Sequence, residues 1–229
     1  MKIIKPYAKM VPHPGRRADG ESFDNMDGLA LLKHVEWCSR ISHRSEESIT
    51  IDSWKRIIQN VVLDHGDWSV TEHAVVTVDA YVDRGITHEW VRHRMGAYTQ
   101  ESTRFVNYQK KMPPSFIQPE AIDDNEERMK WWDVAIAACE VSYQKLLEAG
   151  CAPQIARSVF PNALASRLIV TYNLRSWRHF FIMRTCAEAH PQMRQVTIPL
   201  LQEFQEKIPL LYDDIVPMQK QSEAMKKAR

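Results

Sequence analysis

The sequence predicts one mixed α+β domain, and three observations lead to this prediction. Two runs of β-forming residues, 71–83 and 168–173, lie among longer segments with helical periodicity. The chain has 229 residues, of which 44% are hydrophobic, so it is long enough to bury a sizeable core. No internal repeat, low-complexity linker or shift in composition marks a boundary. We therefore expect a single domain over residues 1–229.

The N-terminal part of the chain predicts one strand and two helices. Residues 1–20 predict a short strand followed by a polar turn that contains Pro and Gly. Asp27 is a suitable N-cap for an apolar-periodic helix over residues 29–41. A second helix is expected over residues 51–64, because Gly66 follows as a stop signal.

The middle of the chain contains the best strand prediction, residues 71–83, which are rich in Val and Thr. We expect this strand at or near the centre of a sheet. A short helix is predicted over 84–94, whereas 96–108 has no clear period and predicts a structured loop. A long helix is expected over 125–148, with Gly150 as its stop. Its apolar residues are predicted to lie partly on one stripe, and they are Trp131, Trp132, Val134, Ala135, Ala138, Val141, Leu146 and Leu147.

The C-terminal part predicts a second strand and two helices. The strand covers residues 168–173, and a helix is expected over 175–189. Pro191 breaks this pattern before a final amphipathic segment over 193–215, and the tail 217–229 is expected to fray.

Composition excludes several classes of function. Thirty Lys and Arg against 29 Asp and Glu leave a net charge of +1, which argues against a general nucleic-acid or membrane-surface binder. No apolar run approaches the roughly 18 residues of a membrane span, and the start of the chain lacks a signal peptide. We expect a soluble, cytoplasmic protein. Its four cysteines have no paired spacing and are expected to be core thiols. Its seven glycines form no phosphate-binding loop, so a nucleotide would be bound by side chains.

The most unusual segment is RHRMGAYTQESTR, residues 92–104, in which three arginines lie close together with few acidic neighbours. Arginine suits phosphate because its planar guanidinium donates parallel hydrogen bonds and stays charged. The alternative is a solvated basic loop. Ser102 has no neighbouring base, so it suits a phosphate ligand better than a nucleophile. His88 and His93 lie five residues apart rather than the four of a zinc helix, and we expect no metal site.

A second arginine cluster lies in residues 173–184. On a helix, Arg175 and His179 share a face, whereas Arg184 points to nearly the opposite side. One possibility is that Arg175 and Arg184 serve different copies of a site at a subunit interface. The other is that Arg178 and Arg184 form surface pairs with the acidic C-terminal region.

Arg92-His93-Arg94, seven further residues and Ser102-Thr103-Arg104 resemble the RHR-x7-SxR signature of flavin-dependent thymidylate synthases. The resemblance extends over roughly residues 35–200, because the chain has similar short matches on both sides of the signature. They are Arg40-Ile41-Ser42, His65-Gly66, Glu72-His73, Ala156-Arg157, Pro161, Asn173-Leu174-Arg175-Ser176 and Arg184.

The resemblance implies a mixed α+β fold with a central, mainly antiparallel sheet flanked by helices, assembled as a homotetramer with shared active sites. It implies methylation of dUMP to dTMP, with methylenetetrahydrofolate as carbon donor and NADPH as reductant through bound FAD. No nucleic-acid or membrane partner is expected. No cysteine nucleophile is needed, which agrees with four scattered cysteines.

The resemblance also implies the site residues. Arg184 is the expected catalytic residue, facing the uracil and stabilising negative charge on it. The flavin is expected to contact Ser69, Arg92, His93, Arg94, Gln100, Asn173, Leu174 through its backbone, Arg175 and His179. The dUMP is expected to contact Glu89, Trp90, Val91, Arg92, Gln100, Glu101, Ser102, Thr103, Arg104, Arg157 and Arg184.

The chain departs from the family pattern at a few positions. Glu89 replaces a common Gln, Asp67 replaces a frequent His, and Ala97 and Thr99 replace Ser and Asn. Two alternatives follow. One is a relative that binds FAD and nucleotide without methylating, and the other is a nucleic-acid or nucleotide-binding module without catalysis.

Overall fold

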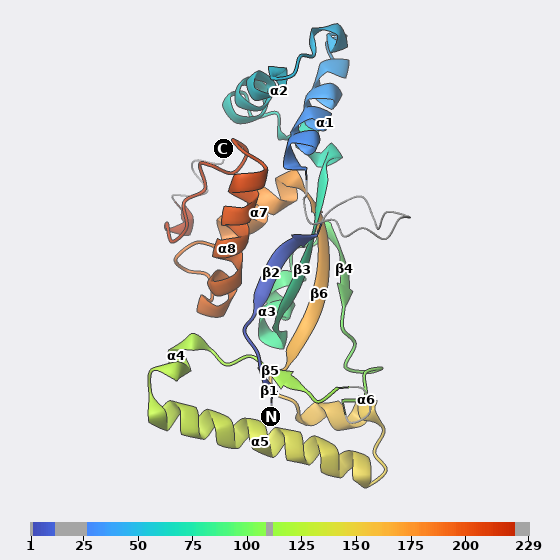
Figure 1. Ribbon diagram of the computed structural model, residues 1–229, viewed down its shortest axis with the longest axis vertical. Helices are drawn as coiled ribbons and strands as arrows, with labels where there is room; N and C mark the ends of the chain where they lie inside the picture. The colour runs from blue at the N-terminus through green and yellow to red at the C-terminus, as the bar shows by residue number, and fades with distance from the viewer. Residues whose placement is uncertain (1, 12–26, 109–111, 223–229) are drawn as a thin grey trace. The chain divides into compact units, whose positions relative to one another are not determined.

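The computed structural model describes residues 2–11, 27–108 and 112–222, and it confirms a mixed arrangement of helices and strands (Figure 1). The strands are β1 (Lys2–Ile3), β2 (Tyr7–Val11), β3 (Val75–Asp83), β4 (Gly96–Gln100), β5 (Ser115–Phe116) and β6 (Ala165–Asn173). The α-helices are α1 (Gly28–Ile41), α2 (Ser53–Arg56), α3 (Arg84–Trp90), α4 (Glu120–Asp123), α5 (Glu126–Glu148), α6 (Pro153–Ala156), α7 (Leu174–Arg184) and α8 (Pro191–Lys207). The 3₁₀-helices are η1 (Glu46–Ser48), η3 (Trp68–His73) and η4 (Arg157–Val159), and η2 (Ile57–Asp64) is a π-helix.

Contacts divide the chain into two compact units. Unit 1 consists of Met1–Tyr7, Ala80–Arg92 and Tyr98–Ile169. Unit 2 consists of Ala8–Asp79, His93–Ala97 and Val170–Arg229. The RHR triplet is split between the units, with Arg92 in unit 1 and the other two residues in unit 2.

The main sheet has four strands in the order β2-β3-β6-β4 and is mainly antiparallel. The run 71–83 was predicted at or near the sheet centre, and β3 confirms this prediction as an interior strand. The strand starts only at Val75, because Trp68–His73 form the 3₁₀-helix η3. A separate parallel pair, β1 and β5, places Lys2 beside Ser115 and Ile3 beside Phe116.

The core of unit 1 lies against helix α5. The Asn125 side chain accepts the N–H of Arg128 at 2.9 Å at the start of this helix, and Gly150, with a φ of +86°, follows its end. Ile136 and Tyr143 are its buried residues, and the Tyr143 ring stacks on Phe160 at 4.5 Å. Of the residues predicted to lie partly on one apolar stripe, none is fully buried. Trp131, Val134, Ala135, Ala138 and Val141 are exposed, while Trp132, Leu146 and Leu147 are half-buried.

The core of unit 2 is an aromatic cluster between α7 and α8. The Phe181 and Phe204 rings lie 4.8 Å apart, and the Trp177 and Phe204 rings 5.2 Å apart. The helix expected over 175–189 ends already at Arg184, and the final helix α8 begins at Pro191 and ends at Lys207 rather than covering 193–215. A proline is tolerated at the first helical position because its missing N–H would have no intrahelical partner there.

Two further elements differ from the sequence prediction. The expected helix 51–64 begins as α2 and continues as a π-helix, η2. The expected loop over 96–108 begins with strand β4. Gly96 allows this strand to form, because a Cβ there would lie 2.1 Å from the Tyr172 ring.

The outer parts of the chain are only partly described. Most of the predicted turn within residues 1–20, and residues 223–229 of the predicted frayed tail, lie outside the described residues. The first part of that tail is bonded, since the N–H of Met218 donates to the Thr185 carbonyl at 2.8 Å. Among the described helices, none is both long enough and apolar enough to cross a membrane.

Candidate functional site

In unit 2, the start of helix α7 carries three of the residues expected at the flavin. Asn173 ends β6, and its side chain accepts the N–H of Ser176 at 2.7 Å. Leu174 is buried, and its N–H donates to the Ala74 carbonyl at 3.0 Å. The Leu174 carbonyl accepts the Tyr212 hydroxyl, also at 3.0 Å. The N–H and the carbonyl of Leu174 are thus both hydrogen-bonded within unit 2, which fixes the start of α7.

Arg175, in the first turn of α7, binds Glu72 of η3. Its Nη1 donates to Oε1 of Glu72 at 2.7 Å, and the two side chains are 55% and 43% exposed. Ser69, in the same η3 turn, is exposed as well. An exposed ion pair contributes only about 0–1 kcal/mol to stability. Arg175 can therefore exchange Glu72 for an acceptor on a ligand at little cost.

His93, His179 and Arg184 meet at the other end of α7. Nε of Arg184 donates to Nε2 of His93 at 2.9 Å, and the His93 and His179 ring centroids are 5.9 Å apart. The His93 ring also lies edge-on to Phe180 at 5.0 Å.

Both imidazoles of this cluster are poor bases. Burial, followed by the charges of Arg184 and His179, lowers the pKa of His93 from 6.5 to about 4. Burial and Arg184 also lower the pKa of His179. Both rings are therefore mainly neutral at pH 7, and Arg184 carries the positive charge of the cluster.

Arg178 has a structural role. Its Nη1 and Nη2 donate to the two carboxylate oxygens of Asp214 at 2.7 and 2.5 Å, and its guanidinium lies 4.5 Å from the centre of the Trp68 ring. The predicted pairing with the acidic C-terminal region is confirmed for Arg178, although the pair is buried on the arginine side rather than at the surface. Arg184 bonds through Nε to His93.

In unit 1, Arg157 and Gln154 bind the Ser102–Arg104 turn. Nη1 of Arg157 donates to the Thr103 hydroxyl at 2.8 Å, and its Nε donates to the Gln154 carbonyl at 3.2 Å. Nε of Arg104 donates to the side-chain carbonyl of Gln154 at 3.1 Å. The Ser102 hydroxyl accepts the N–H of Arg104 at 3.3 Å. The prediction did not include Gln154, which no sequence signal connects to the turn.

Gln100 and Glu101, also in unit 1, are held by neighbouring side chains. Nε2 of Gln100 donates to the hydroxyls of Thr87 and Ser166 at 3.0 and 3.1 Å. Oε1 of Glu101 accepts the Tyr108 hydroxyl at 2.8 Å, and burial together with this bond raises the pKa of Tyr108. Tyr108 therefore stays protonated and fixes the Glu101 carboxylate as an acceptor.

The remaining residues expected at the nucleotide lie at the end of α3 and just after it. Trp90 is fully buried, and its carbonyl accepts the Tyr98 hydroxyl at 3.2 Å. Its side chain belongs to the core, so any ligand contact of Trp90 comes from its backbone. Glu89 and Val91 are half-buried and Arg92 is exposed. Arg94, which follows in unit 2, is exposed too.

Each unit thus brings together part of the predicted set. Unit 2 holds most of the residues expected at the flavin, together with Arg184, and unit 1 holds most of those expected at dUMP. The four cysteines are free, and the prediction of core thiols is right for Cys186 alone, because the other three are half-buried. Unit 2 also contains a cavity whose lining includes Arg40, His43, Arg56 and Asn60, none of which was assigned a ligand contact.

Comparison with known proteins gives consistent matches. The family model described as thymidylate synthase complementing protein matches residues 30–210. The flavin-dependent thymidylate synthase of Pyrococcus furiosus is 32% identical over 196 residues, covering 82% of this chain and 78% of the relative. That of Geobacter sulfurreducens is 32% identical over 157 residues, covering 68% and 67%.

A solved structure shows the same fold. The UMP/dUMP methylase PolB from Streptomyces cacaoi, bound with 5-Br dUMP, has a TM-score of 0.72 at 21% identity, covering 93% of this chain and 96% of that one. The match of the family model over most of the chain, together with relatives at this level of identity, identifies the family. The chain belongs to the thymidylate synthase complementing protein family, which includes the flavin-dependent thymidylate synthases.

Proposed function

We propose that this protein is a flavin-dependent thymidylate synthase that methylates dUMP to dTMP. The observation that carries the proposal is the hydrogen bond between Arg184 and His93, which joins the RHR triplet to the last residue of α7. Family membership and the names of the relatives support the reaction and the flavin. Methylenetetrahydrofolate as carbon donor and NADPH as reductant complete the proposal, on the basis of the resemblance.

The polar groups of unit 2 fit a flavin dinucleotide. Arg94 and Arg175 are exposed cations suited to its diphosphate, and Ser69 supplies an exposed hydroxyl. The neutral imidazole of His179 can donate or accept a hydrogen bond without adding charge, whereas His93, whose Nε2 accepts from Arg184, can act only as a donor through Nδ1. When bound, FAD supplies the hydride-transfer chemistry, so positioning and electrostatics remain for the protein.

Arg184 is proposed to stabilise negative charge on the uracil. Its guanidinium stays protonated at any working pH, and the bond from Nε to His93 holds it in place. A cation held in position before the reaction needs no reorganisation as charge develops, and such groups contribute most to catalysis.

The Ser102–Arg104 turn is proposed to bind the 5′-phosphate. Arg104 and Arg157 both belong to this part of unit 1, and the bonds to Thr103 and Gln154 occupy two of the five N–H donors of Arg157. Guanidinium groups bind phosphate through pairs of parallel hydrogen bonds. The hydroxyl of Ser102 adds a further polar contact.

Assembly as a homotetramer with shared sites is part of the proposal. Arg175 and Arg184 bind different partners, Glu72 and His93, at the two ends of α7. Sites built from several copies of the chain would use both arginines in one pocket. Within a single chain, Arg175 and Arg184 bind different residues at opposite ends of the helix, which supports sites shared between copies.

An absorption spectrum of the purified, desalted protein, followed by anaerobic NADPH with and without dUMP, tests the function. We expect an oxidised-flavin spectrum that bleaches faster when dUMP is present, and dTMP as the product with methylenetetrahydrofolate. Arg184→Ala should retain flavin and lose dTMP formation. A flavin spectrum without turnover of the wild type would favour an inactive relative. No flavin even after incubation with FAD, together with salt-sensitive polynucleotide binding, would favour a binding module.

A further inference from the structure

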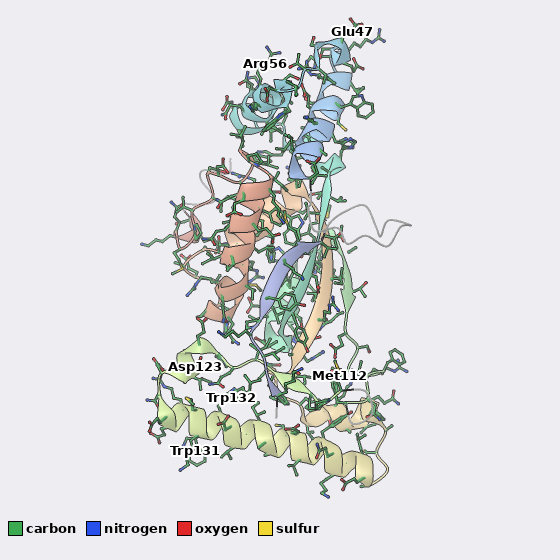
Figure 2. The ribbon with its side chains drawn as sticks, viewed as in Figure 1. Glu47, Arg56, Met112, Asp123, Trp131 and Trp132 are labelled. Carbon is green, nitrogen blue, oxygen red and sulfur yellow. The ribbon has the colours of Figure 1, made fainter. Side chains whose placement is uncertain are left out.

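Helix α5 has two apolar faces, and only one of them is used inside unit 1. Ile136 and Tyr143 are buried in the unit 1 core. On the other side of the helix, Trp131, Val134 and Val141 are 62%, 52% and 54% exposed. Figure 2 shows the side chains of Trp131 and Trp132 on opposite sides of α5, with Trp132 on the side of β1 and β5. The sequence prediction named residues of both faces and placed them only partly on one stripe.

The exposed face has the spacing of a helix–helix interface. Trp131, Val134, Ala138 and Val141 follow each other at alternating intervals of three and four residues. Residues at this spacing form a seam along one side of a helix, as in coiled coils. The same intervals continue to Glu127 at the N-terminal end and to Lys145 at the C-terminal end. We refer to these six residues as the outer stripe.

The outer stripe is complementary to itself in an antiparallel arrangement. With two helices crossing at their middle, Trp131 of one copy lies opposite Val141 of the other, and Val134 lies opposite Ala138, so large residues face smaller ones. In the same register, Glu127 lies opposite Lys145 at both ends, where the exposed Lys145 also pairs with Glu148 of its own chain at 2.6 Å. A parallel arrangement would place Glu127 against Glu127 and Lys145 against Lys145, and like charges disfavour it.

We propose that the outer stripe is an isologous interface between two copies of this chain, paired antiparallel along α5. A two-fold axis makes every contact occur twice. On each side of the axis, this register therefore forms two apolar pairs and one ion pair. The interface needs neither flavin nor nucleotide. It identifies the surface through which two copies would associate. This inference does not depend on the proposed methylation of dUMP.

Charge reversal along the stripe tests this interface. In sedimentation equilibrium at matched protein concentration, Glu127→Lys alone and Lys145→Glu alone should each halve the mass of the assembly, because each places like charges opposite one another. The double variant should restore the mass, since the ion pair is then re-formed with its signs exchanged. The dissociation constant of each single variant should rise by at least about tenfold.

Glu126→Lys is the matched control. Glu126 is the neighbouring residue in the same first turn of α5, and it is exposed, but it lies off the stripe. The Glu126→Lys variant reports any loss of helix stability that a cation near the helix N-terminus causes. It should leave the mass of the assembly unchanged.

A wild type that sediments as a monomer, single variants that keep the full mass, or a double variant that stays dissociated would each overturn the interface. These outcomes are separate from the proposed function. The flavin spectrum and dTMP formation test that function and are read independently of the mass.

Discussion

The direction of the Arg184–His93 hydrogen bond determines the protonation of the imidazole. Arginine can only donate, so Nε2 of His93 must accept, and its proton lies on Nδ1. A protonated His93 would oppose Arg184 and lose this bond. The half-buried position of the ring favours the neutral form as well, and both effects agree with a pKa of about 4. The charge of the cluster thus stays on Arg184, where the proposed reaction needs it.

The depressed pKa of His93 predicts a loss of stability in mild acid. The unfolded chain binds a proton on this residue below about pH 6.5, whereas the folded chain binds it only below about pH 4. The free energy of unfolding should therefore be unaffected by His93 above pH 6.5 and decrease as the pH falls toward 4. Urea denaturation of wild type and His93→Gln at several pH values measures this. The variant should show a shallower decrease, and equal slopes would contradict the assignment.

The sequence predicts the chemistry of single residues better than their partners. The arginines of residues 92–104 stand out by composition and match a family signature, because the motif is local. The bond from Arg184 to His93 spans 91 residues, and that from Arg157 to Thr103 spans 54. Only the fold creates such pairs. Gln154, which joins Arg104 and Arg157, has no local signal at all.

At the scale of elements, the sequence predicts boundaries well where a cap or stop residue marks them. Asp27 caps α1 through the N–H of Ala30, and Asn125 caps α5 in the same way. Predictions were wrong where tertiary packing decides. Strand β4 forms because a neighbouring strand pairs with it. The π-helical turns of η2 leave no distinct pattern of periodicity in the sequence.

The packing of α1 against the end of α8 predicts that Gly28→Ala destabilises unit 2. A Cβ at Gly28 would lie 1.9 Å from the Lys207 carbonyl oxygen, a backbone atom that moves only if a helix shifts. Alanine favours a helix by about 1 kcal/mol over glycine. Overpacking costs about 1–3 kcal/mol or more, so the net effect should be a lower free energy of unfolding in urea.

Gly85→Ala is the contrasting variant. Its Cβ would meet a side-chain oxygen of Asp83 at 3.0 Å, and a side chain can adjust more easily than backbone. We expect a clearly smaller loss of stability than for Gly28→Ala. Equal losses in the two variants would show that the close approach of Gly28 to Lys207 does not limit the packing of α1.

At the scale of the molecule, strands β3 and β6 each run through both compact units. In β6, Ser166 binds Gln100 in unit 1, and Asn173 caps α7 in unit 2. The residues expected at the nucleotide and those expected at the flavin are thus attached to the same strand. The sequence predicts both β-type runs. No local pattern indicates that β6 carries contacts to both the residues expected at the nucleotide and those expected at the flavin.

This division predicts that the two ligands stabilise the protein through different arginines. A ligand present at about a hundred times its Kd stabilises the folded state by about 2.7 kcal/mol, which raises Tm by about 5–10 °C in a chain of this size. Arg175, in unit 2, belongs to the flavin set, and Arg157, in unit 1, belongs to the nucleotide set. Arg175→Ala should therefore lose most of the shift caused by FAD and keep the shift caused by dUMP, whereas Arg157→Ala should do the opposite. Thermal unfolding of wild type and both variants with each ligand alone measures these shifts. If one variant lost both shifts while its ligand-free Tm matched that of the wild type, the assignment of separate arginines to the two ligands would be wrong.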